Sequence, residues 1–226
     1  MSVTGASAGP REINLLDALP RSQRPIKDNR AALQEASDVA RRFGREYFDG
    51  DRTQGYGGYR YDGRWVPVAH RLRDHFDLRA GDRVLDVGCA KGFLLHDLRA
   101  IVPGLHVAGL DISEYAIGQS MPDVRSRLVR GTAHRLPFAS AAFDVVLAIN
   151  VLHNLERAAC IEALREITRV GRRGGYVQVD SWLNEEQRDN LMKWVLTAVT
   201  YHDPAGWREL FAEAGYHGDY YWTLTE

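Results

Sequence analysis

The sequence predicts an α/β fold in which a doubly wound, mostly parallel sheet carries helices on both faces. Three observations support this prediction. β-rich apolar runs alternate with amphipathic stretches from residue 83 onward, the connections between them are short, and a glycine-containing turn joins the first run to the first stretch. Parallel neighbouring strands need a crossover, and a helix is the usual one. At 226 residues the chain is long enough for one such domain with an extension.

The first 65 residues lack this alternation and are expected to form an N-terminal extension, with the main domain at 66–226. Residues 1–30 are polar and contain prolines, so we expect a loose arm over the core. Residues 31–48 repeat apolar side chains at three- and four-residue spacing, which predicts a helix. Residues 49–65 (DGDRTQGYGGYRYDGRW) hold five glycines and three tyrosines and fit neither period.

The remaining elements follow from local pattern. A short helix is expected at 66–78, before the alternation begins. Runs rich in branched apolar residues give the expected strands, which are 83–88, 106–111, 126–130, 143–149, 175–180 and 218–225. Amphipathic stretches give the expected helices, which are 92–102, 113–120 with Ser113 as N-cap, 157–170 ending at Gly171, 184–198 and 205–214.

Composition narrows the function classes. There are 29 basic and 30 acidic residues, which argues against a general electrostatic grip on nucleic acid. No apolar run approaches the roughly 18 residues of a membrane-spanning helix, and no secretory signal pattern opens the chain. Two cysteines cannot form a disulfide framework or a zinc cluster. We therefore expect a cytoplasmic protein without a bound metal.

The most informative run is VLDVGCAKGF at residues 84–93, a strand, a small-residue turn and the start of a helix. Gly88 and Gly92 let the backbone bend sharply and let a ligand approach it closely. In an open parallel sheet, ligands bind beyond the carboxyl ends of the strands. The dinucleotide pattern G-x-G-x-x-G has a different spacing, and the carboxylate of Asp86 would repel a phosphate. These differences argue against a nicotinamide-dependent reductase.

Two carboxylates at the ends of successive strands describe the ligand. Asp86 suits a positively charged amino-acid end, and Asp111 can accept hydrogen bonds from both hydroxyls of a ribose. Together they favour a nucleoside that lacks phosphate and carries a cation. S-adenosylmethionine has that description.

Five segments resemble the class I S-adenosylmethionine-dependent methyltransferases over residues 66–226, namely VLDVGCAKGFLL, GLDIS, the LPF of 136–138, FDVVLAINVLHNL and WRELFAEAGY. This sequence has Ala90 where the family usually has a middle glycine, and Thr132 where many relatives have an acidic or amide residue. Relatives usually finish with two antiparallel strands beyond the fifth, whereas only 218–225 resembles one here. The resemblance therefore implies a six- or seven-stranded Rossmann-like sheet.

The resemblance also implies the cofactor contacts. Those around the methionine part are Asp86, Gly88, Gly92 and Asn150, with Cys89 and Ala90 lining it through their backbone. Those around the ribose and adenine are Asp111, Ile112, Thr132, Ala133 and His134. Ordinary structural roles stay open: Asp86 could cap a turn, Cys89 could be a small turn residue, and Asn150 could end a strand.

Catalytic candidates follow from the reaction. A sulfonium is a good leaving group, so alignment and water exclusion are the main demands, and a hydroxyl or ammonium acceptor also needs a base. His153 is the first candidate base because it follows the fourth strand and titrates near neutral pH. Asp180 comes next, and Tyr201 and His202 follow. A structural role for His153 and a loop-cap role for Asp180 are the alternatives.

The segment 55–65 (GYGGYRYDGRW) is typical of a lid, because flexible glycines carry aromatic side chains. Its substrate-contacting candidates are Tyr56, Tyr59, Tyr61 and Arg64. The alternative is a surface loop that packs its aromatic side chains on the core.

The sequence thus predicts methyl transfer from S-adenosylmethionine, with S-adenosylhomocysteine as product, to an oxygen or nitrogen of a small polar metabolite. A non-methylating enzyme using the same cofactor and a non-catalytic nucleoside-binding module remain alternatives. We expect no nucleic-acid or membrane partner and a monomer or homodimer. Residues 184–198 could form an apolar pocket wall or a dimer face.

Overall fold

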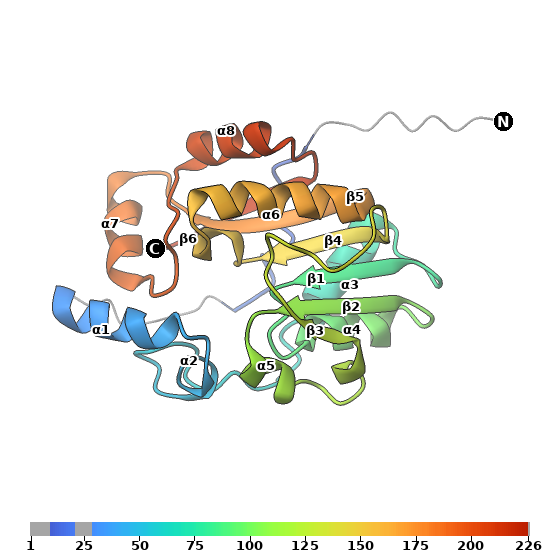
Figure 1. Cartoon of the computed structure of the whole chain (residues 1–226), viewed down its shortest axis with the longest axis horizontal. Helices are drawn as coiled ribbons and strands as arrows, with labels where there is room; N and C mark the ends of the chain where they lie inside the picture. Colours follow the sequence, from blue (N-terminus) through green and yellow to red (C-terminus); the bar gives the residue numbers. More distant parts are fainter. Residues whose placement is uncertain (1–9, 21–28, 226) are drawn as a thin grey trace.

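A computed structural model describes residues 10–20 and 29–225. Its centre is a six-stranded sheet in the order β3-β2-β1-β4-β5-β6, and each pair of neighbouring strands is parallel (Figure 1). The strands are β1 Arg83–Val87, β2 His106–Asp111, β3 Leu128–Arg130, β4 Phe143–Ile149, β5 Gly171–Ser181 and β6 Asp219–Leu224. The predicted doubly wound sheet is confirmed, with six strands, but the final strand β6, expected to be antiparallel, is parallel to β5. The strand order reverses between β1 and β4, where such folds bind ligands.

Helices cover both faces of the sheet. The helices are α1 Arg30–Ala40, α2 Arg45–Asp49, α3 Val66–Phe76, α4 Phe93–Ile101, α5 Glu114–Gly118, α6 Arg157–Val170, α7 Glu185–Trp194 and α8 Pro204–Ala214, with short 3₁₀ turns η1 Arg125–Arg127 and η2 Leu152–Asn154. One core lies between the sheet and helices α6 and α8, and includes Leu164, Trp207 and Phe211. The other lies between the sheet and helices α3 and α4, and includes Leu72 and Leu95. None of the helices in these described ranges is long and apolar enough to cross a membrane.

Two predicted helices are shorter than expected. The single helix expected at 31–48 is wrong: it is broken into α1 and α2, because Phe43 takes a left-handed conformation (φ 48°) and the non-helical Gly44 caps α2. The helix expected at 184–198 ends at Trp194. Residues 195–198 leave the helix and bury apolar side chains, among them Leu196, which packs against α1.

The described part of the polar arm lies along the edge of the sheet. The Ile13 amide donates to the Tyr220 carbonyl at 2.9 Å, and the Tyr220 amide donates to the Arg11 carbonyl at 3.0 Å. The guanidinium of Arg11 also pairs with Asp219 at 3.0 Å. These bonds satisfy backbone groups that an edge strand would otherwise leave unpaired. The rest of the predicted arm, 1–9 and 21–28, lies outside the described residues.

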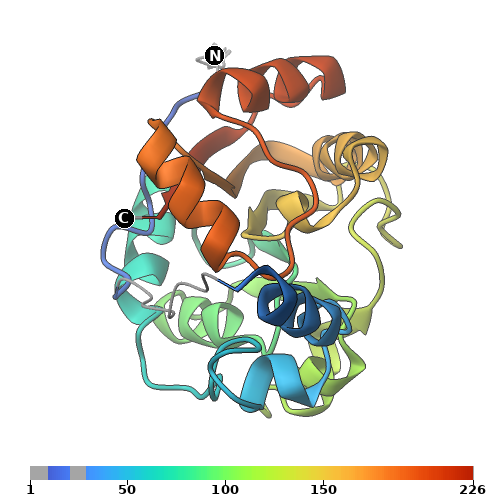
Figure 2. The same ribbon diagram turned by 90° about the vertical axis from the view of Figure 1, so that its left-hand side faces the viewer.

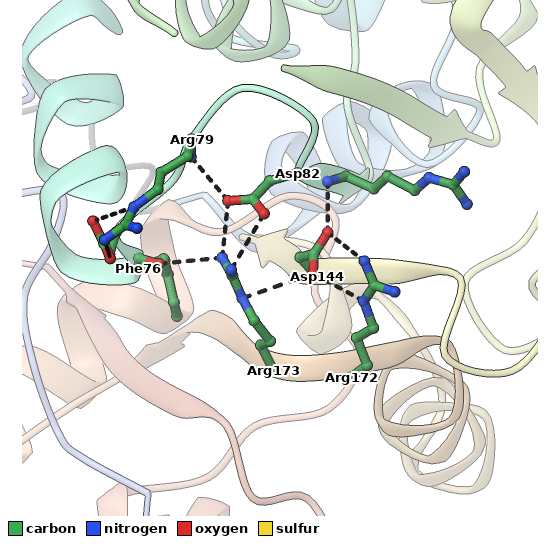
Figure 3. A network of polar contacts seen from close by, with 8 residues as sticks. Phe76, Arg79, Asp82, Asp144, Arg172 and Arg173 are labelled. Atoms are coloured by element: carbon green, nitrogen blue, oxygen red, sulfur yellow. Dashed lines mark hydrogen bonds and ion pairs between the residues drawn. The ribbon is translucent and has the colours of Figure 1, made fainter. Parts of the chain in front are cut away.

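A network of charges joins the starts of the strands (Figure 3). The buried Asp144 carboxylate accepts hydrogen bonds from the Arg83 amide at 2.8 Å and from two nitrogens of Arg172 at 2.9 Å. Hydrogen bonding to Arg172 holds the pKa of Asp144 below its ordinary value despite burial. Arg173 pairs with Asp82 at 3.1 Å. This network fixes the amino-terminal ends of β1, β4 and β5. Ligands of such folds bind at the opposite end of the sheet, beyond the carboxyl ends of the strands.

Helices α1, α2 and α7 lie at the end of the sheet where the carboxyl ends of the strands are found (Figures 1 and 2). The guanidinium of Arg41, which caps α1, donates to the Ala198 carbonyl at 3.1 Å. The Ser113 hydroxyl at the start of α5 donates to the Phe43 carbonyl at 2.6 Å. Residues from the N-terminal extension therefore close over the carboxyl ends of the strands.

Candidate functional site

The turn between β1 and α4 has the backbone conformation that close ligand approach requires. Gly88, Ala90 and Gly92 all have positive φ, at 80°, 48° and 73°. A Cβ on Gly88 would lie 2.0 Å from a methyl carbon of Val151, so only glycine fits there. Gly92 is the N-cap of α4, and its left-handed backbone starts the helix. The left-handed backbone at these three positions therefore defines the shape of the turn.

Asp86 and Asp111 lie at this turn on neighbouring strands. The Asp111 carboxylate accepts hydrogen bonds from the amides of Ala90 at 2.7 Å and Ser113 at 2.8 Å. A carboxylate has about four lone-pair positions, so two remain for hydroxyl donors. Burial raises the pKa of Asp111. The bonds from two loops fix its orientation at the tip of β2.

Asp86 is the least satisfied acid of the site. It is 5% exposed, and no residue that the structure describes donates a hydrogen bond to its carboxylate. Burial, and secondly the charge of Asp111, raise its pKa to about 8. A buried carboxylate beside a second one is costly to ionise unless a cation arrives. The geometry therefore fits a ligand with a positive group at β1.

The side of the site where adenine is expected contains a large exposed apolar side chain. Ile112 follows β2 directly and is 50% exposed, although its neighbour Asp111 is buried. Thr132 forms a bridge with Arg135 across a tight turn, and Ala133 within that turn is buried. His134 is exposed. An apolar face beside a buried carboxylate can pack against a flat ring.

The Cys89 thiol belongs to the turn rather than to the chemistry. It is buried, and burial with the nearby carboxylates raises its pKa well above the ordinary value. A thiol that stays protonated is a poor nucleophile. A Cβ on Gly109 would come 2.6 Å from the Cys89 sulfur, so the thiol fills space against β2.

Asn150 ends β4 in a left-handed conformation, with φ 56°. Its amide N–H donates to the Gln178 carbonyl at 2.8 Å, and its side-chain oxygen accepts from the Thr223 hydroxyl at 2.7 Å. The next residue, Val151, packs against Gly88. Asn150 therefore stands beside the β1 turn.

His153 and Asp180 are brought together in the interior. His153 is 4% exposed, its Nδ1 accepts from the Asp180 amide at 2.9 Å, and its Nε2 lies 3.5 Å from the Asp180 carboxylate. Burial lowers the pKa of His153, and Asp180 opposes that effect. The Nδ1 bond fixes a neutral ring with its proton on Nε2. Since both ring nitrogens face Asp180, the role of His153 as a base toward an acceptor stays a prediction.

Tyr201 and His202 follow a segment that contacts that pair, since the Thr200 amide donates to the His153 carbonyl at 3.0 Å. The Tyr201 hydroxyl donates to the Ala198 carbonyl at 2.5 Å. The His202 ring packs edge-on against Trp207 at 5.3 Å, and burial lowers its pKa. Their catalytic roles also stay predictions.

The tyrosine-rich segment packs on aromatic residues of the extension and of α4. The Tyr59 ring stacks on Phe93 at 4.9 Å and lies 4.5 Å from that of Tyr56. The Tyr61 hydroxyl donates to the buried Asp97 carboxylate at 2.6 Å. Arg64 pairs with its neighbour Asp62. In this conformation the segment is docked, as a closed lid or a packed loop would be.

Lys91 is a site residue that sequence reasoning missed. Its ammonium is 2.6 Å from one Asp49 oxygen and 2.8 Å from the other, and also donates to the Tyr59 carbonyl at 2.8 Å. The Tyr115 hydroxyl donates to the same Asp49 carboxylate at 2.7 Å. Burial acts to raise the pKa of Asp49, but hydrogen bonds from Lys91 and Tyr115 outweigh it and lower the pKa. The only available signal was a lysine between two turn glycines in a chain with three lysines.

Two hollows lie at the end of β5. One of about 600 Å³ lies between the residue-182 region, α7 and α8, and one of about 450 Å³ is lined by Trp182, Arg188, Met192 and Tyr201. Trp182 and Arg188 line both hollows. No acidic partner for the Arg188 guanidinium occurs among residues 10–20 and 29–225. This side of the molecule offers a cationic group beside an indole.

The chain is similar in sequence to known methyltransferases. A family model described as a methyltransferase domain matches residues 85–179. The chain is 32% identical over 130 residues to the sterol 24-C-methyltransferase ERG6B of Gibberella zeae, covering 54% of this chain and 33% of that one. It is 34% identical over 123 residues to the 27-O-demethylrifamycin SV methyltransferase of Amycolatopsis mediterranei, covering 51% and 44%. The matched stretches thus span less than half of either relative.

Among solved structures, the complex between the Haloferax volcanii Trm112 methyltransferase activator and a methyltransferase matches with a TM-score of 0.51 and 24% identity. The match covers 69% of this chain and 74% of that one. At this identity the likeness shows the fold, which is the six-stranded α/β arrangement described above.

Proposed function

We propose, from the premise that this chain belongs to the class I S-adenosylmethionine-dependent methyltransferases, that it methylates an oxygen or nitrogen atom of a small polar metabolite by in-line displacement. The observation that carries the proposal is the buried pair Asp86 and Asp111 at the tips of neighbouring strands. No described residue donates a hydrogen bond to the Asp86 carboxylate. The Asp111 carboxylate accepts two hydrogen bonds and has two lone-pair positions left for a ligand. That arrangement suits an ammonium and a ribose at the two ends of one ligand.

The residues present fit S-adenosylmethionine. Asp86 would hold the ammonium, Asp111 the ribose hydroxyls, and the exposed face of Ile112 the adenine. The positive-φ backbone at Gly88 leaves room for the chain between them. When bound, S-adenosylmethionine would supply a methyl carbon on a sulfonium, a good leaving group.

The protein's own contribution is orientation and water exclusion. The ion pair between Lys91 and Asp49 fastens the N-terminal extension to the β1 turn, and Tyr59 packs over α4. We propose that these two contacts keep the N-terminal extension closed over the site during transfer. A carboxylate acceptor then needs placement alone, whereas a hydroxyl or ammonium acceptor needs a base, for which His153 and Asp180 remain the proposed residues.

We propose that the acceptor approaches from the hollows at the end of β5. Arg188 offers paired N–H donors to a carboxylate or phosphate, and Trp182 offers an apolar wall beside it. The near balance of 29 basic and 30 acidic residues favours a small acceptor over a nucleic acid.

Calorimetric titration with S-adenosylhomocysteine tests the cofactor, with NADH as the control ligand. We expect binding of the first and none of the second, and the reverse result would refute the proposal. Incubation of the protein and methyl-labelled S-adenosylmethionine with a metabolite extract then tests the activity. We expect label in a small molecule. Binding without any labelled product would instead favour the non-catalytic module, and label in RNA would refute the small-molecule acceptor.

A further inference from the structure

A chain of hydrogen bonds crosses β5 and β6 and ends on Asn150. The Tyr176 hydroxyl donates to Gln178 Oε1 at 2.8 Å, and Gln178 Nε2 donates to Thr223 Oγ1 at 3.0 Å. The Thr223 hydroxyl donates to Asn150 Oδ1 at 2.7 Å. Tyr176 and Gln178 are buried, at 0% and 6% exposure. Three side chains from two strands thus form a series of hydrogen bonds that ends on the exposed side-chain amide of Asn150, at the end of β4.

The donors and acceptors of this chain run in one direction. A hydroxyl has a single proton, and Thr223 already accepts a bond from the Gln178 amide, so its proton goes to Asn150. Tyr176 gives its proton to Gln178 at 2.8 Å in preference to the Ile13 carbonyl at 3.2 Å, and accepts from the Leu15 amide. The Asn150 side-chain oxygen is therefore the acceptor, which leaves the N–H2 group of the same side chain as a donor.

That N–H2 group has no acceptor among the described residues, although the other polar atoms of Asn150 are engaged. Its backbone N–H donates to the Gln178 carbonyl, and its backbone carbonyl accepts from Asn154 Nδ2 at 3.3 Å. A left-handed turn at φ 56° needs only a tolerant backbone, which asparagine has. The bond to Thr223 is not needed for that turn. It fixes the direction of two N–H donors.

The position of Asn150 identifies the group that these donors would meet. Asp86 pairs with Leu147 in the sheet, so Asn150 lies three residues beyond it on the adjacent strand. Val151 touches Gly88, which places the end of β4 over the β1 turn. In an amino acid the ammonium and the carboxylate share one carbon. A group that takes the carboxylate must therefore lie beside the one that takes the ammonium.

We infer that Thr223 is a positioning residue, which holds the Asn150 amide so that its N–H2 group donates to the carboxylate of the amino-acid end of the methyl donor. The inference rests on the proposed function. Thr223 acts through Asn150 and touches no ligand. Tyr176 and Gln178 fix Thr223 in turn.

The test compares two ligands that differ only at the amino-acid end. S-adenosylhomocysteine carries the carboxylate, and 5′-methylthioadenosine lacks the whole amino-acid end. Calorimetry would measure both with the full chain, for wild type, Thr223→Val, Thr223→Ser and the control Thr168→Val. Thr168 is an exposed threonine of α6 whose hydroxyl donates to the Leu164 carbonyl.

Thr223→Val is expected to weaken S-adenosylhomocysteine roughly three- to tenfold, the worth of one oriented hydrogen bond. The affinity for 5′-methylthioadenosine should stay within about twofold, and Thr223→Ser and Thr168→Val should bind both ligands like wild type. If Thr223→Val does not fold, Asn150→Gly keeps the left-handed backbone, removes the amide, and should show the same selective loss.

Equal losses for both ligands would overturn the inference, because they would indicate a general distortion of the site. Unchanged affinity of Thr223→Val for S-adenosylhomocysteine would overturn it as well. If wild-type protein binds neither ligand, the proposed function itself fails, and that result differs from a failure confined to the Thr223 variants.

Discussion

Removal of the Asp86 charge should abolish a pH dependence that wild-type protein shows. The relevant change is Asp86→Asn, which keeps the shape of the side chain and removes its titration. In the free protein, burial and the nearby Asp111 raise the Asp86 pKa to about 8. An ammonium ligand binds the ionised carboxylate. At neutral pH most protein molecules carry a protonated Asp86, so binding must remove that proton.

The magnitude follows from that pKa. From pH 6 to pH 7 the ionised fraction of a group titrating at about 8 rises about ninefold, while an α-amino group of ordinary pKa stays mostly protonated. The affinity for S-adenosylhomocysteine should therefore rise by nearly tenfold over this interval. Close to one proton should be released for each ligand bound. In Asp86→Asn the affinity should be flat with pH and, at pH 8, roughly ten- to a hundredfold weaker than wild type.

The assay is calorimetric titration at pH 6, 7 and 8 in two buffers of different ionisation enthalpy, which gives affinity and proton release together. An equal pH slope in wild type and Asp86→Asn would refute the reasoning. Wild-type binding without proton release at pH 7 would also refute it, because Asp86 would then be ionised before the ligand arrives.

The same shift has an opposite effect on folding of the free protein. The pKa of Asp86 is raised from its ordinary value of 3.8 to about 8, so between these limits the native state holds a proton that the unfolded chain has lost. The stability contributed at this site therefore falls as pH rises, by about 1.4 kcal/mol per pH unit at most. Urea unfolding of wild type and Asp86→Asn would show the difference in slope.

Four further changes test the rest of the site and the fold. Lys91→Met should cost about 1–3 kcal/mol in urea unfolding, because the Asp49 carboxylate loses its cationic partner and keeps only the Tyr115 hydroxyl and the Tyr59 amide as donors; addition of Asp49→Asn should recover part of that loss, and no recovery would contradict the pairing. Gly88→Ala should lower stability by about 2 kcal/mol or more and abolish S-adenosylhomocysteine binding, since its Cβ would meet Val151 at 2.0 Å; normal binding would contradict the account of the turn. Asp144→Ala should cost about 1–3 kcal/mol in urea at pH 7, and less as the pH falls through the lowered pKa of Asp144, because protonation removes the advantage in wild type too; it should leave ligand binding intact. His153→Ala should lower the melting temperature because the Asp180 amide loses its acceptor, and unchanged methyl transfer by the folded variant would remove His153 as a base.

The sequence alone predicted what depends on neighbouring residues. Alternating apolar runs gave the strands and their crossover helices, and the Ser113 side chain caps α5 as expected. The β1 turn followed from glycines at fixed spacing, and the placement of Asp86 and Asp111 on adjacent strands followed from the crossover rule. Such features are readable because helix and strand periods, caps and tight turns are set by a few consecutive residues.

The tertiary structure decided the contacts between distant segments. Lys91 meets an acid 42 residues earlier, and Thr223 meets Asn150 across 73 residues. The arm at residues 11–13 lies along β6 from the far end of the chain. The buried state of His153 also came only from the fold. Which polar groups meet, and which of them lose water, depends on how the helices close over the strand ends. No local period records that, because partner choice is fixed by packing and by the need to satisfy each buried polar atom.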